Sequence, residues 1–240
     1  MMEAKERRGR ELAYLAIEPD GYDARRAYPM VVLLHGFGSH MGDLAGLTPA
    51  IDRESYVYIC PNAPISLDIG PGMTGYAWTR LGGQDAEDGD RAEEMLTVLF
   101  DEVMEEYRVE PGAAILGGFS QGGMMTYRNG LIAPERFRGL AALSSRIPEP
   151  ERLRARLPDD RDQAVFIAHG TTDSMIDVDD ARKARQFLEE EGYKPLYKEY
   201  AMAHEINQDV LDDLVPWVHD VLEAPSPGTD RPGSQSPHHL

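Results

Sequence analysis

The sequence has 240 residues, of which 42% are hydrophobic, so it is long and apolar enough for one α/β domain. It carries 42 acidic and 24 basic side chains, and its formal net charge of −18 argues against binding to nucleic acids or anionic membranes. No apolar run approaches the roughly 18 residues of a membrane-spanning helix. The charged segment Met1–Glu11 lacks the apolar core of a secretory signal, so we expect a cytoplasmic protein.

Two details of the composition bear on the source of the protein and on its redox chemistry. Acidic residues are abundant and lysine is scarce, which is typical either of a salt-loving source or of a GC-rich genome. The single cysteine, Cys60, excludes an intrachain disulfide, and we expect it to be a small buried side chain at a strand end.

Strand-like and helix-like segments alternate along most of the chain. Short apolar or alternating runs predict strands at Leu12–Ile17, Met30–Leu34, Tyr56–Cys60, Ala113–Phe119, Leu140–Leu143, Val165–Ala168 and Leu196–Tyr200. Helical periodicity predicts Ala92–Tyr107, Gln121–Ala133, Asp179–Glu191 and Glu205–Leu222, the last kinked or split at Pro216. This alternation predicts an α/β fold with a mostly parallel central sheet of about seven strands and helices on both faces.

Two segments depart from this alternation. Pro61–Asp88 is rich in Gly and Pro and has no clear period, so we expect a long surface excursion near the functional site. Residues 224–240 are Pro-, Ser- and Gly-rich and predict a disordered tail after a single domain that spans residues 1–223.

The strongest chemical signal is the run Gly-Gly-Phe-Ser-Gln-Gly-Gly from Gly117 to Gly123, between a predicted strand and a predicted helix. A G-x-S-x-G turn holds its serine exposed on a sharp, strained bend. Side chains at Gly118 and Gly122 would crowd the neighbouring strand and helix. The pattern therefore predicts Ser120 as a nucleophile, which needs a general base and a group that orients that base.

The favoured base is His204, which lies between the last predicted strand and the last predicted helix. Reactive groups of open parallel sheets gather at the carboxyl ends of the strands. His169 and His35 also follow strands; we expect His169 to fix its loop by hydrogen bonds and His35 to brace a loop whose N–H groups face the site. The remaining histidines are expected at the surface or in the tail: His40, His219, His238 and His239.

The favoured orienting acid is Asp173, the first acidic residue after the strand Val165–Ala168. The acids that follow it are typical of a helix start, where the helix dipole favours negative charge: Asp177, Asp179 and Asp180. The resulting chain order of serine, acid and histidine is the order found in α/β-hydrolases.

Together these motifs resemble the phospholipase/carboxylesterase family of α/β-hydrolases, the relatives of acyl-protein thioesterases. The matching segments are Leu34–Gly38, Gly118–Gly123, His169–Asp173 and Met202–Ile206, and the similarity extends roughly from Leu12 to Leu222. The resemblance implies an α/β-hydrolase fold with no large cap domain.

The same resemblance implies the roles of individual residues. Ser120 would be the nucleophile, His204 the general base and Asp173 its orienter, with an oxyanion hole formed by the backbone N–H groups of Phe37 and Gln121. Unpaired N–H groups at the start of a helix and in a glycine-rich loop suit that role.

The chain departs from the family pattern where a substrate pocket would lie. Ala203 replaces a common Gly before the final histidine, Ser174 replaces a common Pro after the acid, and Trp78 is followed by Thr79 and Arg80. Trp78 either anchors the long loop or lines the substrate pocket, or does both. We expect Met175 to line the same groove and the pair Met124-Met125 to pack under the helix that follows the nucleophile.

The sequence thus predicts a serine carboxylesterase that hydrolyses short- to medium-chain esters through an acyl-enzyme, with no metal or organic cofactor. An acyl-thioesterase or a lysophospholipase would use the same triad, so both stay open as alternatives. A non-catalytic binding protein on a hydrolase fold is a third alternative. The expected partner is a small-molecule ester substrate, and exposed apolar loops near Trp78 are compatible with a homodimer.

Overall fold

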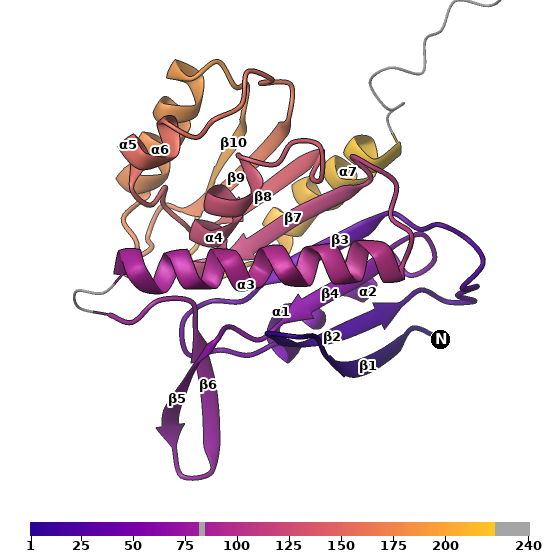
Figure 1. The fold of residues 1–240 in the computed structure, drawn as a ribbon. Coiled ribbons are helices and arrows are strands. Elements are labelled where there is room, and N and C mark those ends of the chain that lie inside the picture. The colour runs from indigo at the N-terminus through magenta and orange to yellow at the C-terminus, as the bar shows by residue number, and fades with distance from the viewer. Residues whose placement is uncertain (82–84, 224–240) are drawn as a thin grey trace, which may run out of the picture.

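The computed structural model describes residues 1–81 and 85–223, in which an eight-stranded sheet forms the centre of the fold (Figure 1). The order across the sheet is β1-β2-β4-β3-β7-β8-β9-β10. The strands are β1 Glu3–Arg8, β2 Ala13–Glu18, β3 Met30–Leu34, β4 Val57–Pro61, β7 Ala114–Phe119, β8 Gly139–Leu143, β9 Ala164–Gly170 and β10 Leu196–Tyr200. β1 and β2 pair in antiparallel fashion, and the six strands from β4 to β10 are parallel. The predicted mostly parallel sheet is confirmed. The predicted tail, 224–240, lies outside the described residues.

The edge strand β1 was not predicted from the sequence, which is why the sheet has one strand more than expected. Its sequence, Glu-Ala-Lys-Glu-Arg-Arg, has almost no apolar residues to reveal an alternating pattern. The strand is held by backbone pairing with β2 and by ion pairs, because the Lys5 ammonium lies 2.7 Å from the carboxylate of buried Glu18. Charged side chains on an edge strand also oppose pairing with another sheet.

Helices cover both faces of the sheet. α3 (Asp85–Glu106), α4 (Gln121–Gly130) and α6 (Val178–Glu190) pack on one face. The short helices α1 (Gly42–Ala45) and α2 (Thr48–Ile51) and the long α7 (Gln208–Glu223) pack on the other. A further short helix, α5 (Pro150–Arg154), precedes β9.

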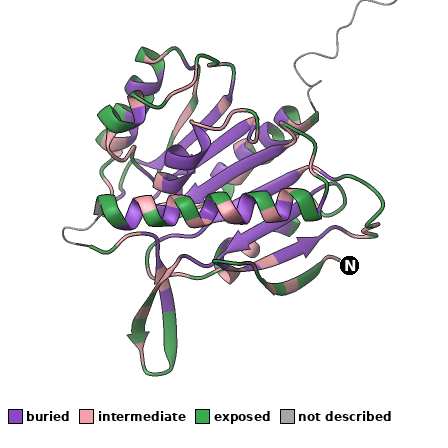
Figure 2. Cartoon of the chain, in the orientation of Figure 1, coloured by how far each residue is buried: buried purple, intermediate pink, exposed green. Residues whose placement is uncertain are grey.

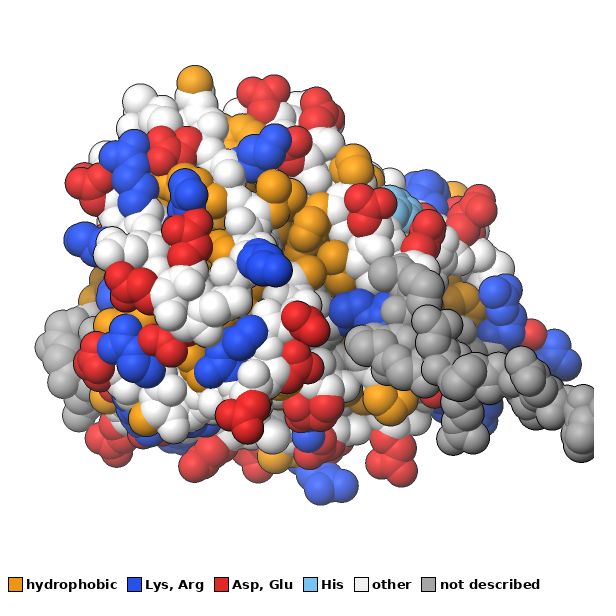
Figure 3. Space-filling model, turned by 90° about the horizontal axis from the view of Figure 1, so that it is seen from above, with side chains coloured by type: hydrophobic (Ala, Val, Ile, Leu, Met, Phe, Trp, Pro, Cys, Tyr) orange, Lys and Arg blue, Asp and Glu red, His pale blue; other side chains and the backbone are white. Residues whose placement is uncertain are grey.

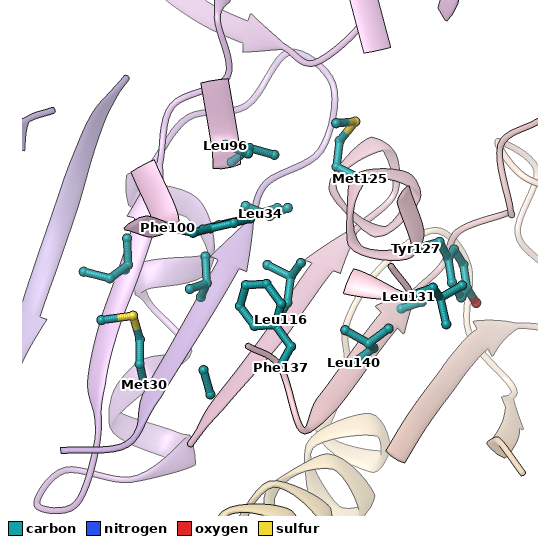
Figure 4. Close-up of a cluster of buried hydrophobic side chains, with 14 of the residues drawn as sticks. Met30, Leu34, Leu96, Phe100, Leu116, Met125, Tyr127, Leu131, Phe137 and Leu140 are labelled. Atoms are coloured by element: carbon teal, nitrogen blue, oxygen red, sulfur yellow. The ribbon is translucent and has the colours of Figure 1, made fainter. Parts of the chain in front are cut away.

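Alternation along β3 shows how the two hydrophobic cores divide the sheet. Met30, Val32 and Leu34 face α3 and α4, whereas Val31 and Leu33 face α7. This is the period of two expected for a strand buried on both faces. Figure 4 shows the first core, where Leu96, Phe100, Leu116 and Phe137 lie between α3 and the sheet.

α7 runs through Pro216 as a single helix, so the predicted split does not occur. Proline removes one backbone hydrogen bond from a helix interior. Buried side chains on either side of it hold both halves against the sheet, including Leu214, Trp217 and Val218.

The predicted surface excursion contains a β-hairpin, β5 (Ile65–Gly70) and β6 (Met73–Ala77), which projects from the body of the protein (Figure 1). Its side chains are mostly exposed or half-buried (Figure 2). Its base is tied to the loop after β3, because Gly38 N–H donates to the Tyr76 carbonyl (2.8 Å) and Tyr76 N–H donates to the Ser39 carbonyl (2.7 Å). The excursion therefore reaches the loop that follows β3.

Acidic and basic side chains are interspersed on the surface, and Figure 3 shows one face where they surround a strip of hydrophobic side chains. Arg182, for example, contacts Asp179 at 2.7 Å and Glu199 at 2.8 Å. Such exposed pairs each contribute little to stability. Cys60 is fully buried, as predicted. Within residues 1–81 and 85–223, no helix is long and apolar enough to span a membrane.

Replacing Leu96 with Ala should lower the free energy of unfolding by about 2–5 kcal/mol, because it leaves a cavity in the fully buried core between α3 and the sheet. Urea unfolding followed by circular dichroism measures this loss. Leu81→Ala is the matched control, since Leu81 is 75% exposed and its truncation should change stability by less than about 0.5 kcal/mol. Equal losses in the two variants would contradict the described core.

Candidate active site

The candidate catalytic side chains follow three parallel strands at their carboxyl ends. Ser120 follows β7, Asp173 lies three residues after β9, and His204 lies four residues after β10. Because parallel strands end at the same edge of the sheet, loops far apart in the sequence converge there.

Ser120 occupies a strained backbone conformation, with φ 55° and ψ −117°. Few residues other than glycine adopt a positive φ. The turn is tight, since a Cβ on Gly122 would lie 1.9 Å from the Leu34 carbonyl oxygen and one on Gly118 would lie 2.3 Å from the backbone of Gly122. The prediction that both glycines are required by crowding is confirmed.

The strained turn is held from both sides by hydrogen bonds to the last residue of β8 and to the loop that follows it. Ser120 N–H donates to the Leu143 carbonyl, and the Ser145 hydroxyl donates to the Ser120 carbonyl, both at 2.9 Å. Ser144, between them, has a positive φ of 46°. Ser145 was not predicted from the sequence; its position two residues after β8, the strand next to β7, was the signal that could have revealed it.

His204 and Asp173 are joined directly. His204 Nδ1 lies 2.6 Å from one carboxylate oxygen of Asp173, whose other oxygen accepts hydrogen bonds from Met175 N–H (2.8 Å) and Ile176 N–H (3.0 Å). The imidazole packs on the ring of Phe119, the residue before Ser120, with 4.7 Å between ring centroids. In the described part of the chain no hydrogen bond joins the Ser120 hydroxyl to His204; such bonds commonly tighten only when substrate binds.

The electrostatics of Asp173 favour its ionised form. Burial opposes ionisation, but hydrogen bonds from Ile176, His204 and Met175 outweigh it and hold the pKa of Asp173 below its usual range. Asp173 is therefore a carboxylate at neutral pH. The stability that it contributes is present above the ordinary aspartate pKa and is lost as the pH falls through the lowered value.

His169 supports this loop, as the sequence predicted. It is fully buried, and its Nε2 contacts the Ile176 carbonyl at 2.9 Å and lies 3.4 Å from the Asp173 carboxylate. His169 therefore fixes the loop that carries Asp173.

The two backbone N–H groups predicted to form the oxyanion hole are those of Phe37 and Gln121. Neither Phe37 N–H nor Gln121 N–H has a hydrogen-bond partner among the described residues. A Cβ on Gly36 would lie 3.4 Å from Ser120 Cβ, so the loop after β3 packs directly on the serine turn. The Gln121 side chain is turned away, because it bonds the backbone of Trp78 and Thr79.

His35 braces this loop in its neutral form. It is buried, its Nδ1 contacts the Gly36 carbonyl at 2.7 Å, and its Nε2 accepts a hydrogen bond from Ala63 N–H at 3.0 Å. Burial lowers the pKa of His35 to about 4. The predicted bracing role of His35 is confirmed, and His40 is exposed as predicted.

A cavity of about 210 Å³ opens beside Gln121. Trp78 lines it, is fully buried and donates its indole N–H to the His35 carbonyl at 2.8 Å, so it anchors the long loop as well. Met124 also lines the cavity, whereas Met125 packs into the core as well as reaching the cavity wall. Met175 is 74% exposed and is not among the residues that line this cavity, so its predicted pocket role stays a prediction.

The parallel sheet, with a serine held at a strained turn between β7 and α4, defines an α/β-hydrolase without a large cap domain. Residues 20–221 match the phospholipase/carboxylesterase family. The chain belongs to this family and is a carboxylic ester hydrolase.

Individual relatives agree with this assignment. The chain is 26% identical over 222 residues to acyl-protein thioesterase 1 of Emericella nidulans, covering 83% of this chain and 92% of the relative. It is 28% identical over 218 residues to acyl-protein thioesterase 1 of Kluyveromyces lactis, covering 83% and 95%. Among solved structures, esterase PE8 is similar with a TM-score of 0.76 and 27% identity, covering 88% of this chain and all of that one.

The neutral state of His35 predicts a pH dependence of stability. Since its folded pKa is about 4 and the ordinary value is about 6.5, the unfolded chain binds more protons between these values. The His35 contribution to the free energy of unfolding should therefore fall by up to roughly 3 kcal/mol as the pH drops from 6.5 to 4. Urea unfolding of His35→Gln should show a flatter pH dependence than the parent protein, whereas exposed His40→Gln should leave it unchanged. Identical slopes in all three proteins would refute the assignment.

The hydrogen bond from Ser145 predicts a positioning role. Ser145→Ala should lower kcat for p-nitrophenyl butyrate about three- to tenfold with little change in KM, because losing about 1 kcal/mol of restraint loosens the Ser120 turn. Steady-state kinetics well below Tm measures this split. A lowered Tm with unchanged kcat would show that Ser145 only stabilises the fold.

Proposed function

We propose that the protein is a serine carboxylesterase that hydrolyses short- to medium-chain esters, with Ser120, His204 and Asp173 as its catalytic triad. The observation that carries the proposal is the Asp173–His204 hydrogen bond of 2.6 Å. His204 also packs on Phe119, the residue before the serine at the strained strand-to-helix turn. Membership of the phospholipase/carboxylesterase family supports it.

In the proposed mechanism, the Ser120 hydroxyl attacks the ester carbonyl carbon while His204 Nε2 takes the hydroxyl proton. Asp173 holds the imidazole through Nδ1 and stabilises its positive charge. The carbonyl oxygen becomes an oxyanion that accepts hydrogen bonds from the N–H groups of Phe37 and Gln121, and each such donor is typically worth about 10²–10³ in rate.

The intermediate then collapses. The bond to the alcohol oxygen breaks, His204 returns the proton to that oxygen, and the acyl group stays on Ser120 as an ester. Water, deprotonated by His204, attacks this acyl-enzyme and releases the carboxylic acid and free Ser120. Every proton in the cycle passes through His204, so the described residues suffice for the reaction.

The volume of the cavity supports a substrate of modest size. A space of about 210 Å³ beside Gln121, lined in part by Trp78 and Met124, suits a short to medium acyl or alcohol group. The proposal also includes a small-molecule ester substrate, a cytoplasmic location and a homodimer, all three of which stay predictions.

Thioester hydrolysis is the alternative that a specific observation favours. Two relatives whose alignments cover 83% of this chain are named acyl-protein thioesterase 1. One acyl-enzyme on Ser120 would serve ester, thioester and lysophospholipid substrates. Comparing kcat/KM for p-nitrophenyl butyrate, S-butyryl-N-acetylcysteamine and a lysophosphatidylcholine ranks the three leaving groups. A tenfold preference for the thioester would replace the carboxylesterase assignment.

Replacing Ser120 with Ala should abolish turnover of p-nitrophenyl butyrate, with a loss of at least about 10⁴-fold in kcat, because no other nucleophile lies at the turn. Ser66→Ala, on the exposed hairpin, is the matched control and should keep the parent activity. Release of p-nitrophenol measures both. Retained activity in a folded Ser120→Ala protein would refute the proposed nucleophile.

A further inference from the structure

The cavity beside the serine turn carries an unbalanced charge. It lies between the first residues of α3, the start of α4 and the loop after β8, and most of its lining is apolar or uncharged. Three charged side chains line it: Arg128, Arg146 and Glu149. Whether each of these charges has an ion-pair partner decides the net charge that the cavity presents to a ligand.

Arg128 and Glu149 neutralise each other. The Arg128 guanidinium is almost fully buried and contacts Glu149 through one nitrogen, Glu93 at 2.8 Å through Nε, and Asp90 through a third nitrogen. Two further arginines complete this network: Arg152 contacts Asp90 and Glu149, and Arg156 contacts Glu93. Three carboxylates thus face three guanidinium groups, and no net charge from this network is left for the cavity.

Arg146 has no such partner. Its side chain is exposed at the cavity wall, and no carboxylate among the described side chains, those of residues 1–81 and 86–223, forms an ion pair with it. Other arginines of this acidic chain do contact carboxylates, for example Arg80 with Asp88 and Arg182 with Glu199. The cavity therefore presents one uncompensated guanidinium.

The loop places Arg146 close to the proposed chemistry. It directly follows Ser145, whose hydroxyl bonds the Ser120 carbonyl at 2.9 Å. Across the same cavity lie Gln121, whose backbone N–H is a proposed oxyanion donor, and Met124, whose N–H bonds the Ser120 carbonyl at 3.2 Å. Arg146 therefore lines a cavity whose wall includes Gln121, the residue directly after Ser120.

We propose that Arg146 selects ester substrates that carry a second, anionic group, a carboxylate or a phosphate, on the acyl or the alcohol part. This inference rests on the proposed esterase function and adds the substrate class. A guanidinium offers a planar pair of N–H donors that matches a carboxylate or a phosphate, and such charge-assisted bonds are about twice as strong as neutral ones. The apolar remainder of the cavity receives the chain that links the anion to the ester.

The test compares matched esters that differ in one anionic group. Mono-p-nitrophenyl glutarate and p-nitrophenyl valerate have acyl chains of equal length and differ in the terminal carboxylate. The pair 4-acetoxybenzoate and methyl 4-acetoxybenzoate places the carboxylate on the alcohol part instead. The ratio of kcat/KM within each pair measures selection for the anion and shows which part of the ester faces Arg146.

Three variants isolate the side chain. Arg146→Gln should lower the anionic-to-neutral ratio about tenfold in at least one pair, with the neutral ester hydrolysed as in the parent protein. Arg146→Lys should keep part of the preference, since it retains the charge but not the planar donors. Arg8→Gln, on the far edge strand β1, makes the same change in net charge and should leave both ratios unchanged.

The outcomes separate this inference from the proposed function. Ratios that stay the same in Arg146→Gln and the parent, while neutral esters are turned over, would overturn the role of Arg146 and leave the esterase intact. An equal drop in Arg8→Gln would assign the effect to overall charge and also overturn it. Failure of the parent protein to hydrolyse any of the four esters would overturn both proposals.

Discussion

The site depends on one backbone constraint, the positive φ of Ser120 at the turn from β7 into α4. A non-glycine residue in such a conformation costs roughly 1–3 kcal/mol and persists only when its surroundings hold it. Here the Leu143 carbonyl and the Ser145 hydroxyl hold both ends of the Ser120 peptide unit, and Gly122 permits contact with the Leu34 carbonyl. The strain exposes the hydroxyl and starts a helix whose first N–H is free.

Two neighbouring loops are organised around that turn by buried neutral groups and by one buried charge. His35, neutral because of its burial, and Trp78 tie the loop after β3 to the long excursion, and Gly36 in this loop packs on Ser120. Hydrogen bonds from Ile176 N–H, His204 and Met175 N–H hold Asp173 as a carboxylate, and His169 fixes the loop that carries it. The parallel sheet brings these loops to one edge, and contacts within the loops orient the side chains of the site.

Much of this arrangement could be predicted from the sequence, because its signals are local. Apolar runs revealed the inner strands, and the glycines around Ser120 revealed the turn. The edge strand β1 and the hairpin β5–β6 carry no such pattern, since backbone pairing holds both of them rather than burial, with ion pairs added at β1. The role of Ser145 depends on its contact with Ser120, and the proposed role of Arg146 depends on its place in a cavity wall. No residue spacing in the sequence predicts either feature.

The central claim is that Ser120 is the activated nucleophile, and covalent labelling tests it most directly. A fluorophosphonate reacts with a serine hydroxyl only where a base activates it and an oxyanion site receives the phosphonyl oxygen. After treatment, peptide mapping by mass spectrometry should find one adduct per chain, on Ser120, formed in step with the loss of esterase activity. An adduct on another residue, or full inactivation with Ser120 unmodified, would contradict the account.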